Sequence, residues 1–290
     1  MRHPALEGVL REERELVYAF GGFAVELAGG TLVTNERVPV PRFNFVEEVS
    51  VARERMSGFF EKALDHYFQR ALRPEFHLPD PPPEHLVAVL TRLGFLARPE
   101  PRSVLICPRS VEVPPPPREF TARAAVPEEL DLIIDFWAAT REREELRRCL
   151  QVLWEHPNPE ERVIPALAFS EESVASVALL HRYRGVWGIH AVATQPTNRG
   201  RGAASAIVLA ALHRILPPGE APVAIWADHA RVRRRLETLG FHEILRERVY
   251  ELGPKAELHL PPASASAGPL WRPSRARPGN GPGGASGRTP

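Results

Sequence analysis

The stretch that decides the fold reads VATQPTNRGRGAAS and runs from Val192 to Ser205. The apolar residues before it predict a strand that ends near Thr194, and the alanine-rich run after it predicts a helix that begins at Gly202. Pro196 helps to end the strand because proline has no N–H to donate. Glycines in a strand-to-helix turn let backbone amides approach a ligand closely, and the first helical turn adds unpaired N–H groups and a positive dipole end. The stretch therefore predicts a turn that binds phosphate groups.

Two other phosphate-binding motifs are excluded. The stretch contains no G-x-G-x-x-G, so it is not the Rossmann fingerprint. It is not a P-loop either, because the Gly-Lys-Ser/Thr ending is missing. Gly-Arg-Gly by itself also fits a plain surface turn with exposed arginines, and only the surrounding elements favour phosphate binding.

The segments around this stretch alternate between strand and helix. They are, in order, a strand near Phe120, helices over 128–139 and 144–154, strands over 163–169, 174–183 and 186–194, a helix over 202–216, a strand over 222–227, a helix over 230–240, and two short strands that end near Leu252. This order predicts an α/β fold in which helices cover both faces of a mixed sheet.

Composition divides the chain of 290 residues into two domains and a tail. The four prolines at 114–117 cannot continue a helix or a central strand, so they predict a stiff linker. We place one domain at 1–113 and the other at 118–252. Residues 253–290 are dominated by Pro, Gly, Ser, Ala and Arg, and they have too few apolar side chains to offset the entropy of ordering. This tail is predicted to be disordered.

The first domain has the marks of a partial copy of the second. LTRLGF at 90–95 and LETLGF at 236–241 share a helix end, a glycine suited to a left-handed cap, and a phenylalanine that returns to the sheet. Helix ends of this kind are common, so an unrelated first domain is the alternative. The first domain has no counterpart of the phosphate-binding turn, and a copy would therefore lack that site.

Charge and composition argue against several classes of protein. Lys and Arg number 37 and Asp and Glu 36, a formal charge of +1, so nothing demands a nucleic acid or an anionic membrane as partner. Charged residues interrupt the first twenty positions, which leaves no apolar core for a signal peptide. Cys107 and Cys149 have no second ligand nearby in sequence, so we expect reduced thiols, no metal site and a cytoplasmic location.

Together with its flanking elements, the turn resembles the acetyl-CoA loop of the GNAT superfamily of N-acetyltransferases. The loop pattern is Arg or Gln, two residues, Gly, one residue, then Gly or Ala, and it is met here by Arg199, Gly202 and Ala204. The resemblance covers the segment from Phe120 to Leu252 and includes LGF at 239–241. It implies the GNAT acyl-CoA N-acyltransferase fold, in tandem with a degenerate first copy.

The resemblance also implies a binding site for acetyl-CoA as co-substrate. The loop amides would cradle the pyrophosphate, and the end of the preceding strand would pair with the pantetheine arm, which requires this strand to splay from its neighbour. His229 stands where many members have an asparagine that contacts the pantetheine. The arginines at 231 and 233–235 either contact the distal part of the cofactor or form a solvated face. The cofactor-binding residues expected on this basis are Val192, Ala193, Thr194, Arg199, Gly200, Arg201, Gly202, Ala203, Ala204, Ser205 and His229.

Acyl transfer to an amine needs a base for the amine proton, a donor to the thioester oxygen, and an acid for the departing thiolate. His190 is the candidate base, because strand alternation places it on the same face as Val192. Arylalkylamine-type members of the superfamily use a histidine at a similar position. A histidine satisfied within the sheet is the alternative, and Thr194, Glu171 and Glu172 are the other candidate bases.

The sequence gives weaker evidence for the acid that protonates the departing thiolate. Many members of the superfamily have a tyrosine four residues before the glycine of the Gly-Phe pair, and this chain has Leu236 there. Tyr250 of the last strand is the candidate substitute, with water as the alternative. A backbone amide near Val192 is the expected donor to the thioester oxygen.

These expectations combine in an N-acetyltransferase that passes the acetyl group of acetyl-CoA directly to an amine of a small molecule or peptide within a ternary complex. A non-catalytic acetyl-CoA sensor is the alternative, favoured by the missing tyrosine and the additional domain. Nucleic-acid binding through the arginines at 231–235 is disfavoured by the near-neutral charge. The sequence identifies neither the acceptor nor the oligomeric state.

Overall fold

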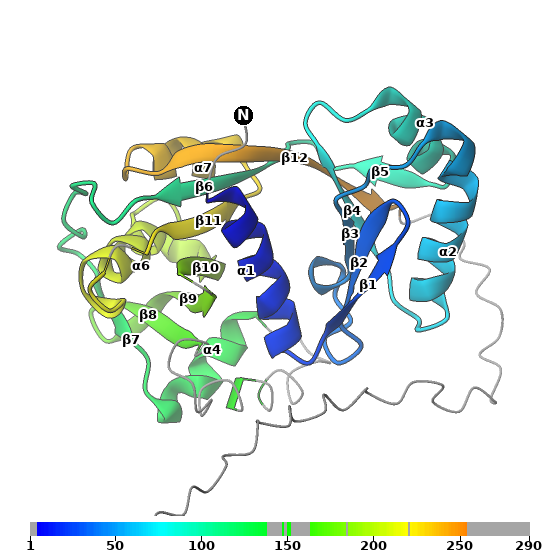
Figure 1. The fold of residues 1–290 in the computed structure, drawn as a ribbon. Helices are drawn as coiled ribbons and strands as arrows, with labels where there is room; N and C mark the ends of the chain where they lie inside the picture. The colour runs from blue at the N-terminus through cyan, green and yellow to red at the C-terminus, as the bar shows by residue number, and fades with distance from the viewer. Residues whose placement is uncertain are drawn as a thin grey trace, which may run out of the picture.

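The computed structural model describes residues 5–137, 147, 150–151, 163–183, 185–219 and 221–253. Two bodies of sheet and helix lie side by side (Figure 1). Helix α1 (Leu6–Ala19) lies between them, and strand β12 (His242–Leu252) runs from one body into the other.

Each half of the chain supplies its own set of elements. After α1, the amino-terminal half contains β1 (Phe23–Leu27), β2 (Gly30–Thr34), β3 (Phe45–Glu47), α2 (Met56–Phe68), β4 (Glu75–Pro79), α3 (Glu84–Arg92), β5 (Phe95–Ala97) and β6 (Arg102–Cys107). Before β12, the carboxyl-terminal half contains β7 (Thr121–Ala124), α4 (Leu130–Trp137), β8 (Ile164–Ser170), β9 (Ser173–Tyr183), β10 (Val186–Thr194), α6 (Ala203–Ala210), β11 (Val223–Ala227) and α7 (Ala230–Glu237).

The strands of the described residues form one mixed sheet. Their order is β1-β2-β3-β4-β12-β6-β11-β10-β9-β8-β7, and β5 pairs with β12 beside this path. Most neighbours are antiparallel, but β3 with β4 and β10 with β11 are parallel. The structure therefore confirms the predicted mixed α/β sheet.

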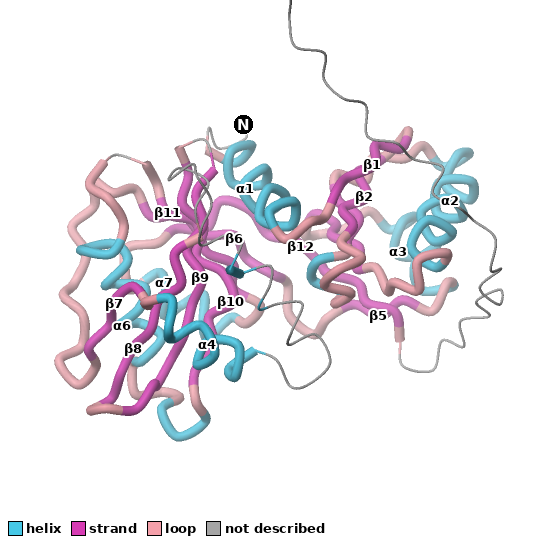
Figure 2. Tube along the Cα trace, turned by 90° about the horizontal axis from the view of Figure 1, so that it is seen from below, coloured by secondary structure: helices cyan, strands magenta, loops and turns pink. Residues whose placement is uncertain are grey.

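Helices cover both faces of the carboxyl-terminal part of this sheet. Ile207 of α6 and Leu236 of α7 belong to the core on one face. On the other face, Leu16 of α1 and Ile134 of α4 pack with Leu179 of β9. Seen from below, α1 again lies between the two bodies, and α2 and α3 lie together on the outer side of the amino-terminal body (Figure 2). No helix among the described residues is long and apolar enough to cross a membrane.

Two strands cross between the halves. β6 follows β5 in the chain, yet it lies between β11 and β12 and is antiparallel to both. β12 continues beyond β6, and its last residues lie between β4 and β5, with Tyr250 opposite Phe76 on one side and Ala97 on the other. Neither half by itself therefore contains every strand of its part of the sheet.

The two halves repeat one order of elements. β3-α2-β4-α3-β5 in the first half matches β10-α6-β11-α7-β12 in the second, and each series begins with a parallel strand pair. Each half leaves its last helix through a left-handed glycine, Gly94 at φ 84° and Gly240 at φ 92°. The exchanged strands β12 and β6 also occupy matching places, between β4 and β5 and between β11 and β12. This repeat agrees with the predicted tandem fold.

Most of the expected elements of the carboxyl-terminal half are present. The strands predicted over 163–169, 174–183, 186–194 and 222–227 are confirmed as β8, β9, β10 and β11, and the helices predicted from 128, 202 and 230 as α4, α6 and α7. Most of the helix predicted over 144–154 and nearly all of the tail over 253–290 lie outside the described residues. The prolines at 114–117 carry no helix or strand, and the domain boundary there stays a prediction.

The two short strands predicted before Leu252 are wrong. One strand of eleven residues, β12, takes their place. It passes a register shift between Glu243 and Leu245 while paired with β6, and it then continues onto β4. Its length comes from having one partner in each half, which local sequence does not reveal.

A buried charge cluster holds α1 against the exchanged strands. The guanidinium of Arg102 on β6, only 3% exposed, donates to Glu13 of α1 at 2.5 Å and to Glu247 of β12 at 3.0 Å. Burial works to raise the pKa of the Glu13 carboxyl, but the charges of Arg102 and His77 and the hydrogen bonds from Arg102 together outweigh it and leave that pKa below its ordinary value. Loss of Arg102 would leave two carboxylates in the interior without their partner.

Arg102→Met is therefore expected to lower the free energy of unfolding by about 3 to 5 kcal/mol, the usual result of removing one member of a buried ion pair. Urea denaturation followed by circular dichroism measures the change. Arg123→Met is the matched control, because the Arg123 side chain is 46% exposed and pairs with Glu129 at the surface, where such a pair contributes about 1 kcal/mol or less. Equal losses in the two variants would contradict a central role for Arg102.

Candidate functional site

The connection from β10 to α6 is a tight turn shaped by two glycines. After β10, a 3₁₀ turn at Pro196–Asn198 leads to Gly200 at φ 78° and Gly202 at φ 105°, values that residues with a side chain rarely adopt. Gly202 is the N-cap of α6, and its carbonyl accepts the Ala206 amide at 2.9 Å. The sequence therefore places its glycines where the backbone must turn left-handed.

Backbone amides gather without acceptors at this turn. The amides of Gly200, Gly202, Ala203, Ala204 and Ser205 donate to no acceptor among the described residues. The first amides of a helix have no partner inside the helix and carry the positive end of its dipole. The turn is therefore ready to bind an anion.

Arginines of the neighbouring helix add positive charge beside these amides. Arg235 of α7 donates from Nε to Ser205 Oγ at 3.1 Å. Arg231 Nη2 lies 3.8 Å from the position that a Cβ on Gly200 would occupy. Together with the two arginines of the turn itself, they favour a ligand that carries several negative charges.

β10 and β11 separate before β10 ends. Their parallel pairing covers only Trp187 to Ile189 on β10, opposite Val223 to Ile225 on β11. β10 continues to Thr194 and keeps β9 as its neighbour on the other edge. Among the described residues, the pairing of β10 with β11 therefore stops at Ile189, as the predicted splay requires.

A bulge reverses the side-chain alternation in this last part of β10. Ala191 has φ 51°, and the pairing with β9 shifts between His190 and Ala193. Val192 packs on the α6 side of the sheet, whereas His190 contacts Glu12 of α1 on the opposite side. The prediction that His190 and Val192 share a face is therefore wrong, because simple alternation does not survive an inserted residue.

His190 is held by a carboxylate from the amino-terminal half. Its Nε2 lies 2.9 Å from each carboxylate oxygen of Glu12, and His181 Nδ1 lies 2.8 Å from the same carboxylate. Glu12 is fully buried, while His190 is 7% exposed. Burial works to raise the pKa of the Glu12 carboxyl, but the charge of His190 and the hydrogen bonds of both histidines outweigh it and leave that pKa below its ordinary value.

Comparisons of the sequence find nothing, whereas comparisons of the structure find many proteins of similar fold. No protein-family model and no curated protein match the chain. A GCN5-related N-acetyltransferase from Kribbella flavida aligns with a TM-score of 0.57 at 16% identity, over 83% of this chain and 94% of that one. Another from Sphaerobacter thermophilus aligns with a TM-score of 0.55 at 18% identity, over 79% and 83%. The chain has the GNAT fold.

The tandem form of the GNAT fold is also represented. A tandem GNAT protein from the clavulanic acid biosynthesis pathway aligns with a TM-score of 0.50 at 14% identity, over 78% of this chain and 80% of that one. Identities this low show a shared fold and leave activity and substrate to be argued from the residues of this chain.

The structure brings most of the predicted cofactor-binding residues of the GNAT fold to one place. The end of β10, the glycine turn and the start of α6 are contiguous, and they hold all of those residues except His229. His229 is the N-cap of α7 just beyond β11, and its exposed ring lies 3.8 Å from Glu100. It therefore stands at the same end of the parallel pair as the turn.

Tyr250, the candidate acid, does not lie with the predicted cofactor-binding residues. It lies on the part of β12 that pairs with β4 and β5, and it is buried in the core of the amino-terminal half with Phe76 and Phe95. Burial raises the pKa of its hydroxyl. The predicted role of Tyr250 as acid is inconsistent with this position, because the exchange of β12 carries the residue into the other half.

The amino-terminal half does not reproduce the glycine turn of the GNAT fold. Glu48, just after β3, has φ 54° and matches Ala191 of β10. The chain then passes through a 3₁₀ helix at Arg53–Arg55, and α2 begins at Met56 with no left-handed glycine before it. The phosphate-binding features are therefore present in one half.

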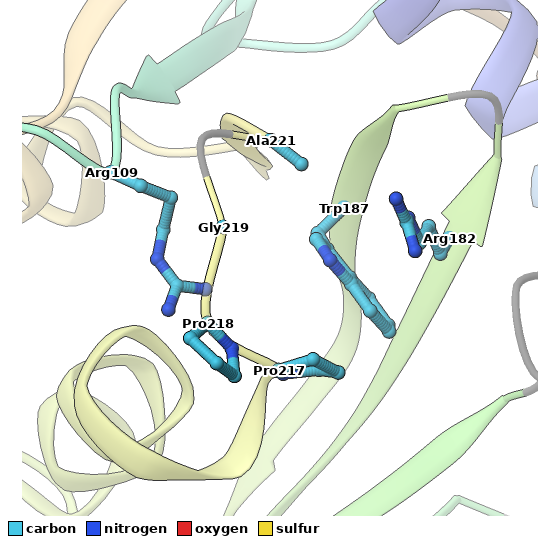
Figure 3. Close-up of a pocket in the computed structure, with 7 residues that line it drawn as sticks. All are labelled: Arg109, Arg182, Trp187, Pro217, Pro218, Gly219 and Ala221. Carbon is cyan, nitrogen blue, oxygen red and sulfur yellow. The ribbon is translucent and has the colours of Figure 1, made fainter.

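A small pocket lies away from the glycine turn (Figure 3). Its lining includes Arg109, Arg182, Trp187 and the turn at 217–219. Trp187 is near the first residue of β10, whereas the glycine turn follows the last. The pocket volume of about 80 Å³ is well below the roughly 300 to 1,000 Å³ of typical ligand sites. This pocket is separate from the candidate site.

Sequence reasoning missed the surroundings of the candidate base. Glu12, His181 and Trp226 all contact His190 or its carboxylate partner. A signal for Glu12 was present, because an acidic residue sits on the helix face whose apolar members include Val9 and Leu16. A glutamate on the buried face of a helix needs a partner for its charge. No local signal marked His181 or Trp226.

Proposed function

We propose that the chain is an N-acetyltransferase that uses acetyl-CoA and an amine acceptor. The observation that supports this most is the set of five acceptor-free amides at the turn from 200 to 205, beside two strands that have separated. A diphosphate needs such donors, and an amide-containing arm such as pantetheine can take the place of a missing strand. The GNAT fold of the chain agrees with this use of the site.

In this proposal the site binds acetyl-CoA through its backbone. The acceptor-free amides at 200 and 202–205 hold the pyrophosphate, and the end of β10 beyond its pairing with β11, from Val192 to Thr194, pairs with the pantetheine. His229 contacts the pantetheine from the start of α7. The arginines of α7 face the distal phosphate end, since Arg231 and Arg235 reach the turn.

The catalytic step is direct transfer within a ternary complex. His190 Nδ1, which has no hydrogen-bond partner among the described residues, takes a proton from the acceptor amine. The neutral amine nitrogen gives up this proton as it bonds to the thioester carbonyl carbon, while the Val192 amide donates to the oxygen. The carbon–sulfur bond breaks, and the sulfur leaves with the electron pair and takes a proton from water. The protonated His190 then neutralises the hydroxide that remains.

A screen of amines tests the proposal. Full-length protein is mixed with acetyl-CoA and amines of different classes, from polyamines and aminosugars to peptide amino termini, and free thiol is followed with a chromogenic disulfide. At least one amine is expected to raise thiol release well above hydrolysis, and mass spectrometry should find the acetylated amine. Tight binding of acetyl-CoA without transfer to any amine would instead favour the non-catalytic sensor.

The full-length chain is expected to bind one acetyl-CoA. The glycine turn with its acceptor-free amides occurs before α6, whereas α2 begins without left-handed glycines. Isothermal titration calorimetry with protein of known active concentration gives the stoichiometry. A value near two would mean that the turn before α2 also binds the cofactor, in contradiction to its geometry.

A further inference from the structure

The helix that covers the candidate base belongs to the other half of the molecule. α1 begins the amino-terminal half, yet it packs on β9 and β10 of the carboxyl-terminal half (Figure 1). Glu12 and Glu13 lie on its buried face. Arg102 of the exchanged strand β6 donates to Glu13. This contact fixes the position of α1 along its axis, and therefore the position of Glu12.

The contact between Glu12 and His190 selects one form of the imidazole. Both oxygens of Glu12 lie 2.9 Å from Nε2, and a carboxylate can only accept a hydrogen bond. Nε2 therefore carries the proton, and Nδ1 keeps its lone pair. Nδ1 has no hydrogen-bond partner among the described residues. This division between the two nitrogens is what a general base requires.

Two residues of the sheet, Gly188 and Trp226, leave space for the Glu12–His190 contact and hold the imidazole ring in place. Gly188 lies two residues before His190, and a Cβ there would collide with His190 Nε2 and with both oxygens of Glu12. On the next strand, Trp226 stacks on the imidazole with ring centroids 4.6 Å apart and planes 26° apart. The ring is thus fixed in orientation by a carboxylate on its edge and an indole on its face.

We infer that Glu12 is a positioning residue for His190, and that the amino-terminal half, which lacks the glycine turn, completes the active site of the other half through α1. The role of His190 as base is taken from the proposed function. Glu12 sets the tautomer of His190 and stabilises its protonated form after it has taken the proton of the amine. A single chain with two halves is needed because neither half holds both members of the pair.

The charged groups around His190 determine the sign of the expected effect. Glu12 and Glu13 face it from α1, and Glu13 is bound by Arg102, which also binds Glu247. His181 faces the same carboxylate from β9, and β11 contributes the uncharged Trp226. Glu12 is thus the negative charge that contacts the ring, and its removal makes protonation of His190 less favourable.

Glu12→Gln is the direct test, because glutamine keeps the shape and loses the charge. Turnover is expected to fall by about 10- to 100-fold, the usual loss when the partner that orients a functional histidine is removed. The acidic limb of the rate profile should move to lower pH, and acetyl-CoA affinity should stay unchanged. A purely structural role would lower stability without moving that limb. Glu7→Gln, an exposed change on the same helix, is the matched control and should leave turnover and profile unchanged.

A second readout does not depend on turnover. In ¹³C-histidine spectra, with the His190 signal assigned from its loss in His190→Ala, the titration midpoint of His190 should lie at lower pH in Glu12→Gln than in the wild type, because an adjacent negative charge is lost. Gly188→Ala displaces the same contact from the strand side and should shift the midpoint in the same direction. It keeps the inference falsifiable if Glu12→Gln does not fold.

The outcomes separate the inference from the proposed function. An active wild-type enzyme whose Glu12→Gln variant keeps the same turnover, acidic limb and midpoint would overturn the inference alone. A wild-type protein that releases no thiol with any amine would overturn the proposed function, and with it the catalytic meaning of the pair. A shifted limb together with a shifted midpoint supports both.

Discussion

Gly202→Glu is expected to raise the dissociation constant for acetyl-CoA by more than about 100-fold, equivalent to roughly 3 kcal/mol of binding free energy. Gly202 caps α6 in a left-handed conformation at φ 105°. A glutamate there places a negative charge among the amides that are proposed to hold the pyrophosphate, at a helix end that favours anions of the ligand. Isothermal titration calorimetry on folded protein measures the loss.

Two control variants separate charge from backbone strain. Gly202→Ala carries the same left-handed strain without a charge, so its loss of affinity should be clearly smaller. Gly185→Glu introduces the same side chain at an exposed glycine with φ 85° and open space around it, at the other end of β10. Its affinity should equal that of the wild type. An unchanged affinity in Gly202→Glu would remove the basis for placing the cofactor at this turn.

His190→Ala is expected to lower turnover by roughly 10² to 10⁴, the usual range for loss of a general base. Acetyl-CoA affinity should hardly change, because the proposed cofactor contacts are made by backbone from 192 onward. The wild-type rate should fall in acid as the imidazole takes up a proton, and the variant should lose that limb. Steady-state rates across pH, with the best amine from the screen, provide both measurements.

Stability needs a control here, because His190→Ala leaves the fully buried Glu12 with His181 as its remaining histidine partner. His190→Gln retains a side chain that can donate to the carboxylate, yet it cannot act as a base. It should be more stable than His190→Ala and equally impaired in turnover. His213→Ala, at an exposed histidine beyond α6, should retain full activity. Full turnover with an unchanged acidic limb in His190→Ala would assign the base elsewhere, and Glu171 and Glu172 would be tested next.

The sequence was sufficient for features that depend on neighbouring residues. The apolar residues before Thr194, the glycines at 200 and 202 and the alanine-rich run after them predicted β10, the turn and α6. The prolines at 217 and 218 and the glycine at 240 likewise marked where two helical segments end. These signals are reliable because glycine and proline restrict or free the backbone at their own positions.

The register of the sheet could not be obtained in the same way. β12 is predicted locally as two strands, and only its successive pairing with β6 and β4 makes it one. The same pairing carries Tyr250 into the core of the amino-terminal half. The bulge at Ala191 places His190 and Val192 on opposite faces, although the local sequence gives no sign of an inserted residue. Strand partners and inserted residues are settled by packing between distant segments.

By itself, the sequence determined the order of elements in the carboxyl-terminal half and the position of the phosphate-binding turn, because both depend on short-range backbone preferences. Only the tertiary structure decided which groups surround His190. Glu12 is 178 residues away in the chain, and it reaches the imidazole because α1 packs on β10 and Gly188 leaves space for the contact. A pair of this kind arises from packing between two halves. The helix pattern places Glu12 on the buried face of α1, but it does not show which residue of the other half will meet it.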